Sequence, residues 1–228
     1  MGQDINVKRF KAEKGVIGKG RAGDDITQEI AEPARSGRHR RLAVDPRTVF
    51  VIHGRDIEAR DALFAFLRAL RLEPQEWEHL VRATGKGAPS LAEVVDRAVR
   101  EAQAVVALLT PDDVVRLHPD LRNGSDAAVD REAGCQARPN VYLELGMALA
   151  ALPDATVILE AGGLRRTTDL AGLNYVTVDS SAEWRNKVAE RLHNAGCPVD
   201  RGGGDWQQPR WFADLQAYHR RAAKKNGA

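Results

Sequence analysis

A single acidic side chain interrupts a long apolar segment of this 228-residue chain. Between Val141 and Leu152, Glu144 is the only charged residue. Apolar residues stand there on nearly every side of the expected helix, and such a helix is expected to be buried. An ionised carboxylate is costly to bury unless a partner pairs with it. Glu144 is therefore expected either to have a partner or to be held without one, where it can stabilise a positive charge that develops on a substrate.

The start of this helix leaves a structural alternative for Glu144 open. Asn140 is a favourable N-cap residue, and Pro139 before it discourages an earlier start. A capping box would require Glu or Gln at position 143, where the chain has leucine. With Asn140 as the N-cap, Glu144 would lie in the first turn, where the helix dipole favours an acidic side chain.

Two apolar runs that are typical of buried parallel strands, residues 49–52 and 104–109, end in polar groups. In doubly wound α/β folds, ligands bind at the carboxyl ends of the strands where the winding reverses, which here are the first and third strands. We therefore expect a substrate site made by the polar residues after these strands and by the start of the helix that carries Glu144. Its members are His53, Arg55, Asp56, Thr110, Asp112 and Asn140.

The side chains of this expected site have different roles, and each role has a structural alternative. The Arg55 guanidinium suits a bidentate contact with a phosphate group, but it could also be a solvated loop residue. Asp112 could contact a hydroxyl of the ligand or only solvate its loop. Asp56 could be the N-cap of the helix that follows it. For His53, a packed histidine at a strand end is favoured over a general base.

Strand and helix signals alternate along residues 47–198, which indicates βαβ units and a parallel sheet with helices on both faces. Five short strands fit a flavodoxin-like α/β fold with strand order 2-1-3-4-5. Residues 90–93, with the sequence SLAE, have the form of a capping box and predict a helix start. The expected strands are residues 49–52, 73–77, 104–109, 155–159 and 174–178, and the other helices begin near residues 56, 140 and 184.

The flanking and connecting segments lack these patterns. Residues 1–46 are rich in Gly, Lys and Arg and are predicted to form a flexible arm. Residues 112–138 are polar and are expected to form a long loop. In the C-terminal tail, residues 199–228, the spacing of Trp211, Leu215 and Tyr218 predicts a short amphipathic helix.

Composition limits the classes of function. The formal net charge is only +2, which argues against a dedicated nucleic-acid-binding protein. Cys135 and Cys197 lie far apart without metal-ligand spacing, so we expect no metal site and a reducing cytoplasmic location. The N-terminus has no apolar core of the kind that signal peptides contain, and no segment is long enough to form a membrane helix.

Four segments, in this order, resemble the bacterial TIR-like family of predicted nucleotide-binding proteins. They are residues 49–56 (VFVIHGRD), 108–113 (LLTPDD), 138–146 (RPNVYLELG) and 169–175 (DLAGLNY). The similarity covers about residues 47–197 and implies a TIR-like fold. It also implies an effector of antiphage defence, and several such effectors cleave NAD at the nicotinamide–ribose bond when a sensor assembles them. The catalytic glutamate of the family corresponds to Glu144.

The sequence departs from the family pattern in two ways. Effectors of this family often carry a cyclic-nucleotide sensor domain in the same chain, and neither residues 1–46 nor the last 30 or so residues are long enough for a conventional one. The activating signal is thus expected from a separate sensor protein, with a cyclic nucleotide as the alternative. Asn140 stands where many TIR enzymes outside this subfamily have tryptophan, so their aromatic contacts are not transferred.

The resemblance therefore favours an NAD+ glycohydrolase that self-associates through its TIR-like domain, with NAD as substrate and no cofactor. One carboxylate suffices, because nicotinamide leaves NAD as a neutral molecule and needs no general acid. Two alternatives stay open. One is an enzyme like the nucleoside deoxyribosyltransferases, in which the carboxylate is the nucleophile. The other is a non-enzymatic signalling scaffold that binds nucleotide.

Overall fold

The computed structural model describes residues 44–76, 80–82, 84–125, 131–165 and 172–222, and these belong to one compact unit. The predicted N-terminal arm lies, up to residue 43, outside the described residues. So do residues 169–171 of the last segment that resembles the TIR-like family. None of the described helices is long and apolar enough to cross a membrane.

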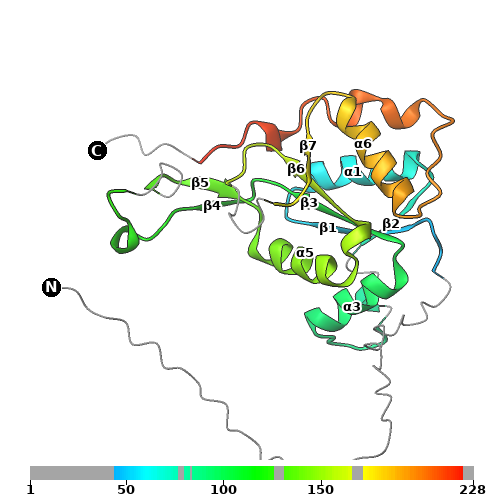
Figure 1. Ribbon diagram of the computed structural model, residues 1–228, viewed down its shortest axis with the longest axis horizontal. Helices are drawn as coiled ribbons and strands as arrows, with labels where there is room; N and C mark the ends of the chain where they lie inside the picture. The colour runs from blue at the N-terminus through cyan, green and yellow to red at the C-terminus, as the bar shows by residue number, and fades with distance from the viewer. Residues whose placement is uncertain (1–43, 77–79, 83, 126–130, 166–171, 223–228) are drawn as a thin grey trace, which may run out of the picture. The chain divides into compact units, whose positions relative to one another are not determined.

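A five-stranded parallel sheet forms the centre of the fold (Figure 1). Its strands lie in the order β2-β1-β3-β6-β7, which confirms the predicted order 2-1-3-4-5 once the two strands of a separate small sheet are set aside. The central strand β3 is buried at every position, as expected for a strand covered on both faces. The strands are β1 (Thr48–His53), β2 (Glu73–Gln75), β3 (Ala104–Leu109), β6 (Thr156–Ala161) and β7 (Tyr175–Val178).

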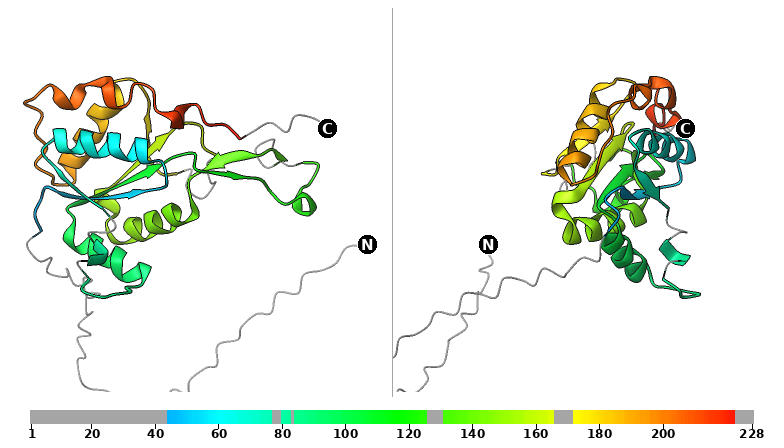
Figure 2. Two further views of the ribbon diagram at one scale, coloured as in Figure 1. Left: turned by 180° about the vertical axis from the view of Figure 1, so that it is seen from behind. Right: turned by 90° about the vertical axis from the view of Figure 1, so that its right-hand side faces the viewer.

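Helices cover both faces of this sheet. Helices α1 (Ile57–Ala69) and α6 (Glu183–Asn194) lie on one face, and α3 (Leu91–Glu101) and α5 (Pro139–Ala151) lie on the other (Figure 2). Alternate residues of β1 enter different cores, with Val51 on the α1 face and Phe50 on the α5 face. The predicted capping box starts α3, with the Ser90 and Glu93 side chains each bonded to the other's backbone N–H.

The expected loop over residues 112–138 contains a two-stranded antiparallel ribbon instead. β4 (Asp113–Val115) pairs with β5 (Gly134–Gln136), and Val114 lies opposite Cys135. Figure 1 shows the ribbon extending away from the main sheet. Sequence reasoning missed it because three-residue strands are too short to give a periodic pattern.

The C-terminal segment does not form the predicted amphipathic helix. It makes three separate 3-10 turns, η4 (Asp205–Gln207), η5 (Pro209–Trp211) and η6 (Gln216–Tyr218). Phe212 packs edge-on against Trp184 of α6, with ring centroids 4.6 Å apart, and Leu215 is also buried. The residues that enter the core therefore do not follow helical spacing, and the segment completes the core on the α1 and α6 face.

Candidate functional site

Helix α5 begins two residues earlier than the sequence indicated, because its N-cap is residue 138 and not residue 140. Pro139 is its first residue, a position that suits proline because the first N–H of a helix has no intrahelical partner. Arg138 is the N-cap, and its side chain makes no capping hydrogen bond. The expected N-cap role of Asn140 is therefore wrong, and Asn140 lies exposed in the first turn.

This start also changes the interpretation of Glu144. Counted from Pro139, Glu144 is the sixth helical residue, and the first turn of α5 contains no acidic side chain. The helix dipole acts mainly within the first turn, so it does not account for this carboxylate. The structural alternative that placed Glu144 in the first turn is therefore wrong.

The environment of Glu144 is partly apolar and gives it no partner. Its side chain is half-buried, and none of the described residues donates a hydrogen bond to it or forms an ion pair with it. Burial raises the pKa of Glu144 to about 7, because a desolvated carboxylate favours its neutral form. A carboxyl group with its pKa near neutrality is typical of an acid held for chemistry.

The helix is less buried than its composition predicted. Val141, Leu145 and Ala148 form the buried stripe of α5, whereas Leu143 on the other side is 52% exposed. Glu144 lies at one margin of the buried stripe and Tyr142 at the other. Burial raises the pKa of Tyr142, a hydrogen bond with the Ala137 backbone opposes this shift, and the charge of Glu160 in β6 adds to it.

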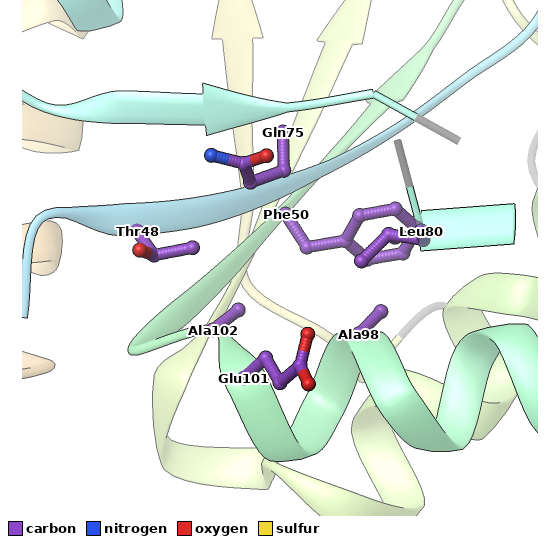
Figure 3. A pocket seen from close by; sticks show the side chains of 7 residues that line it. All are labelled: Thr48, Phe50, Gln75, Leu80, Ala98, Glu101 and Ala102. Atoms are coloured by element: carbon purple, nitrogen blue, oxygen red, sulfur yellow. The ribbon is translucent and has the colours of Figure 1, made fainter. Parts of the chain in front are cut away.

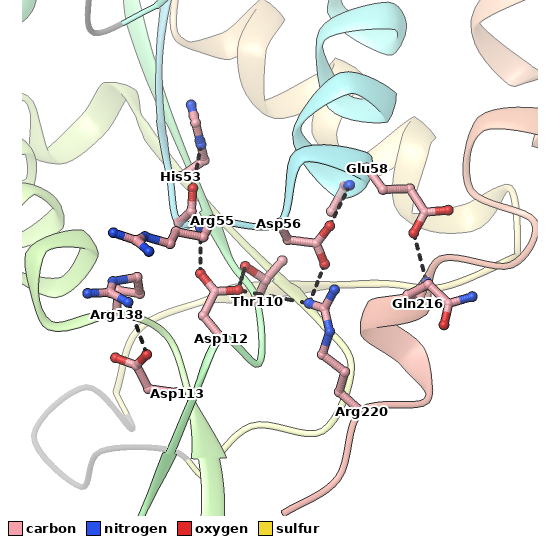
Figure 4. Close-up of polar contacts among 12 residues, drawn as sticks. His53, Arg55, Asp56, Glu58, Thr110, Asp112, Asp113, Arg138, Gln216 and Arg220 are labelled. Atoms are coloured by element: carbon pink, nitrogen blue, oxygen red, sulfur yellow. Dashed lines mark hydrogen bonds and ion pairs between the residues drawn. The ribbon is translucent and has the colours of Figure 1, made fainter.

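The polar residues after β1 and β3 form a closed network (Figure 4). Asp56 is the N-cap of α1, since its Oδ1 accepts from the backbone N–H of Ala59 at 3.0 Å. Its Oδ2 accepts from Nη1 of Arg220 at 2.6 Å, and the Asp56 side chain is only 2% exposed. The N-cap alternative for Asp56 is thus what the structure contains, and both of its oxygens are engaged within the protein.

Asp112 joins the loop that follows β1 to the loop that follows β3. Its Oδ2 accepts from the backbone N–H of Arg55 at 2.8 Å, and its Oδ1 accepts from the Thr110 hydroxyl at 2.8 Å. A Cβ at Gly54 would lie 1.7 Å from Oδ2 of Asp112, so this close approach requires glycine. Thr110 and Asp112 therefore hold the loop of Arg55, whose own side chain is exposed.

His53 lies at the end of β1, half-buried, with its ring edge-on to Phe64. Its Nδ1 donates to the Gly54 carbonyl at 2.8 Å. Burial lowers the pKa of His53 and the charge of Arg60 adds to this, while the Gly54 carbonyl and the acids Glu76 and Asp112 oppose the shift. A neutral, packed histidine follows, as the sequence favoured.

The structure thus brings together His53, Arg55, Asp56, Thr110 and Asp112, and no described hydrogen bond or ion pair joins them to Glu144 or Asn140 on α5. Sequence reasoning missed two arginines. Arg138 pairs with Asp113 at 3.3 Å, and Arg220 pairs with Asp56 across 164 residues of chain. No local pattern predicts a contact of that separation.

Three cavities lined by described residues lie away from Glu144 and from the polar network. The one in Figure 3, of about 140 Å³, opens between β1, β2 and α3 toward the amino ends of the strands, lined by Thr48, Phe50, Gln75, Leu80, Ala98, Glu101 and Ala102. Two more, of about 370 and 300 Å³, lie beside α6 and at the end of α1. Glu144 lines none of these three cavities. What distinguishes Glu144 as a candidate catalytic residue is its partial burial and its lack of a partner among the described residues. The described residues contain no group of three or more His, Cys, Asp or Glu side chains that could hold a metal ion.

Comparison with known proteins places the chain among related sequences. A model of the TIR domain of CAP12/Pycsar effector proteins matches residues 48–180. YuaY of Escherichia coli (strain K12), an uncharacterized protein, is 28% identical over 156 residues, which are 68% of this chain and 48% of YuaY. The chain thus spans about half the length of the curated relative that it matches. The family match covers β1 to β7 and includes Glu144, and it ends before α6 and the C-terminal segment.

Proposed function

The chain belongs to the CAP12/Pycsar effector TIR domain family of antiphage effectors, and on this premise we propose that it is an NAD+ glycohydrolase that cleaves the nicotinamide–ribose bond. The single observation that supports this most is Glu144, a half-buried carboxylate without a partner among the described residues. A structural acid would be expected to have a hydrogen-bond or charge partner.

The proposed reaction needs only one carboxylate. The nicotinamide of NAD is a pyridinium and leaves as a neutral molecule, so no general acid is required. Positive charge then develops on the ribose, and the Glu144 carboxylate stabilises it at short range. Removal of one such preorganised group typically costs about 10²–10³ in rate.

The raised pKa of Glu144 is compatible with this role. At pH 7 the free carboxyl group is divided between its acid and ionised forms, because its pKa is about 7. A bound pyridinium brings positive charge next to the carboxylate and lowers its pKa. The substrate thus selects the ionised form of Glu144, which then acts with little solvation.

The remaining side chains have supporting roles in this proposal. Asn140 lies exposed one turn before Glu144, on the same side of α5, where its amide can contact a ribose hydroxyl. Arg55 offers an exposed guanidinium to phosphate. Thr110, Asp112 and Asp56 hold the loops, and neutral His53 packs against Phe64.

We also propose that assembly activates the enzyme, through a separate sensor protein or a cyclic-nucleotide signal. Leu143 is next to Glu144 in sequence and 52% exposed on α5. A second copy that covers this apolar side of the helix would exclude water near Glu144 and strengthen its interaction with the substrate.

Release of free nicotinamide from NAD tests the proposed function. The purified protein is incubated with NAD, both dilute and clustered on a surface, beside the Glu144→Gln variant. We expect weak release when dilute, more when clustered, and a loss of about 10²–10³ in the variant. Exchange of free bases on a deoxynucleoside, without cleavage of NAD, would instead indicate the deoxyribosyltransferase alternative. NAD binding without either reaction would indicate the scaffold.

A further inference from the structure

The C-terminal segment crosses the carboxyl ends of the central strands. At Gln216 its backbone N–H donates to Oε2 of Glu58, in the first turn of α1, at 3.0 Å. The Ala217 carbonyl lies so close to Gly162, just after β6, that a Cβ there would be 2.1 Å away. Gly162 has a φ of +79°, which also favours glycine. The segment is therefore fitted closely to this edge of the sheet.

Arg220 is the charged side chain that this segment brings to the strand ends (Figure 4). Its Nη1 donates to Oδ2 of Asp56 at 2.6 Å and lies 4.0 Å from Oδ1 of Asp112. Asp56 follows β1 and Asp112 follows β3, so Arg220 lies where the strand order reverses. This is the position at which doubly wound α/β folds bind phosphorylated ligands.

The Arg220 guanidinium still has donors to offer. Its contacts with the described residues use Nη1 alone, which leaves Nε and Nη2, and the side chain is 39% exposed. The hydrogen bond to Asp56 holds the Nη1 end of the guanidinium at the strand ends, and the Nε and Nη2 donors are on the side away from that contact. A planar pair of N–H donors matches two oxygens of a phosphate group.

The two carboxylates that lie against Arg220 do not present a negative surface to a ligand. The Asp56 and Asp112 side chains are 2% and 4% exposed. Each also accepts hydrogen bonds from within the protein, from Ala59 and Arg220 or from Arg55 and Thr110. Arg220 therefore reaches solvent, whereas the two carboxylates beside it do not.

We propose that Arg220 binds the pyrophosphate of the dinucleotide substrate, an inference that rests on the proposed NAD+ glycohydrolase function. Arg55 was the arginine that the sequence favoured for this contact, but no described residue fixes its side chain, whereas Asp56 orients Arg220. Residue 220 lies outside residues 48–180 that the family model matches, so the family match assigns Arg220 no role. In this proposal Arg220 is a specificity-determining residue that distinguishes substrates by their phosphates.

The test compares two substrates that differ in their phosphates. NAD carries a pyrophosphate, and nicotinamide riboside has the same scissile bond without phosphate. For Arg220→Gln we expect the KM for NAD to rise about tenfold or more with kcat little changed, because a charge-assisted contact is lost. The KM for nicotinamide riboside should stay the same. Arg220→Lys, which keeps the positive charge beside Asp56 but loses the planar fork, should give an intermediate KM for NAD and serves if the glutamine variant does not fold.

Arg221→Gln is the matched control. Arg221 is the next residue, is exposed, and donates only to carbonyls of its own segment. It should leave both substrates unaffected. An equal loss on NAD and nicotinamide riboside in Arg220→Gln, or no loss on either, would overturn the inference.

Binding of ADP separates this inference from the proposed function, since it requires no turnover. We expect ADP to bind the wild type and Arg221→Gln alike, and Arg220→Gln about tenfold more weakly. If the wild type released no nicotinamide but ADP binding still depended on Arg220, the glycohydrolase proposal would fail and the phosphate site would stand. Equal ADP affinity in all variants, with active wild type, would reject the phosphate site alone.

Discussion

Glu144 and Asp56 are both acids near the start of a helix, but they differ in burial and in the number of partners that their carboxylates have. Asp56 has a partner for each oxygen and is almost fully buried. Glu144 is half-buried, has no partner among the described residues, and its pKa is raised to about 7. An acid that stabilises the fold should have its partners in place. The difference indicates that Asp56 organises the edge of the sheet, and it supports the proposal that Glu144 acts on the substrate.

The largest effect is expected when the partnered acid loses its partner. Arg220→Ala leaves the Asp56 carboxylate buried with one hydrogen bond and no counter-charge. Breaking a buried pair in this way usually costs about 3–5 kcal/mol, and the exposure of Arg220 places the expected loss near 3 kcal/mol. Urea unfolding of the variant and the wild type measures the difference. An unchanged midpoint would show that the pair is not what holds the C-terminal segment.

The sheet was predictable because its signals are local. β3 is a continuous apolar run, and its limits in the sequence and in the structure are the same residues, 104–109. Ser90 and Glu93 lie within one turn of each other, so a capping box can be identified from the sequence alone. Once five strands alternate with helices, the order of the sheet follows from general rules of connection.

The arrangement of the site was less predictable, for two physical reasons. The Asp56–Arg220 pair depends on how the C-terminal segment folds back, and no pattern links residues 164 positions apart. The start of α5 depended on a choice between Pro139 and Asn140, and the preference of proline for the first helical position decided it. Glu144 could be singled out from the sequence, but its lack of a partner could not.

The second-largest effect concerns Glu144, the acid without a partner among the described residues. Removal of its charge should raise the free energy of unfolding, whereas Arg220→Ala should lower it. Burial raises the Glu144 pKa from 4.5 to about 7, so the folded protein binds an extra proton between these values. The free energy of unfolding should therefore fall as the pH rises from 4.5 through 7. At about 1.4 kcal/mol per pKa unit, discounted because the group is only half-buried, the loss is on the order of 2 kcal/mol.

Glu144→Gln removes this titration and serves as the reference for all other groups. The difference in unfolding free energy between the variant and the wild type, measured from about pH 4.5 to about pH 8, should grow in favour of the variant as the pH rises. A difference that stays flat would mean that the Glu144 pKa is not raised by folding, and a variant less stable than the wild type at the upper end of this range would mean that the carboxylate has a partner in the folded protein.

The smallest effect is expected from a comparison of two Asp56 variants, which separates its role as the N-cap of α1 from its pairing with Arg220. Asp56→Asn keeps a side-chain oxygen for the cap, but it loses the charge and the acceptor that face Arg220, because an amide nitrogen takes the place of Oδ2. Asp56→Ala loses these and also the hydrogen bond to the Ala59 N–H. Asparagine and aspartate cap helices about equally well, and loss of a cap costs about 1 kcal/mol. Urea unfolding should thus place Asp56→Ala about 1 kcal/mol below Asp56→Asn. If the two variants unfold alike, the cap contributes little, and the carboxylate is held chiefly by Arg220.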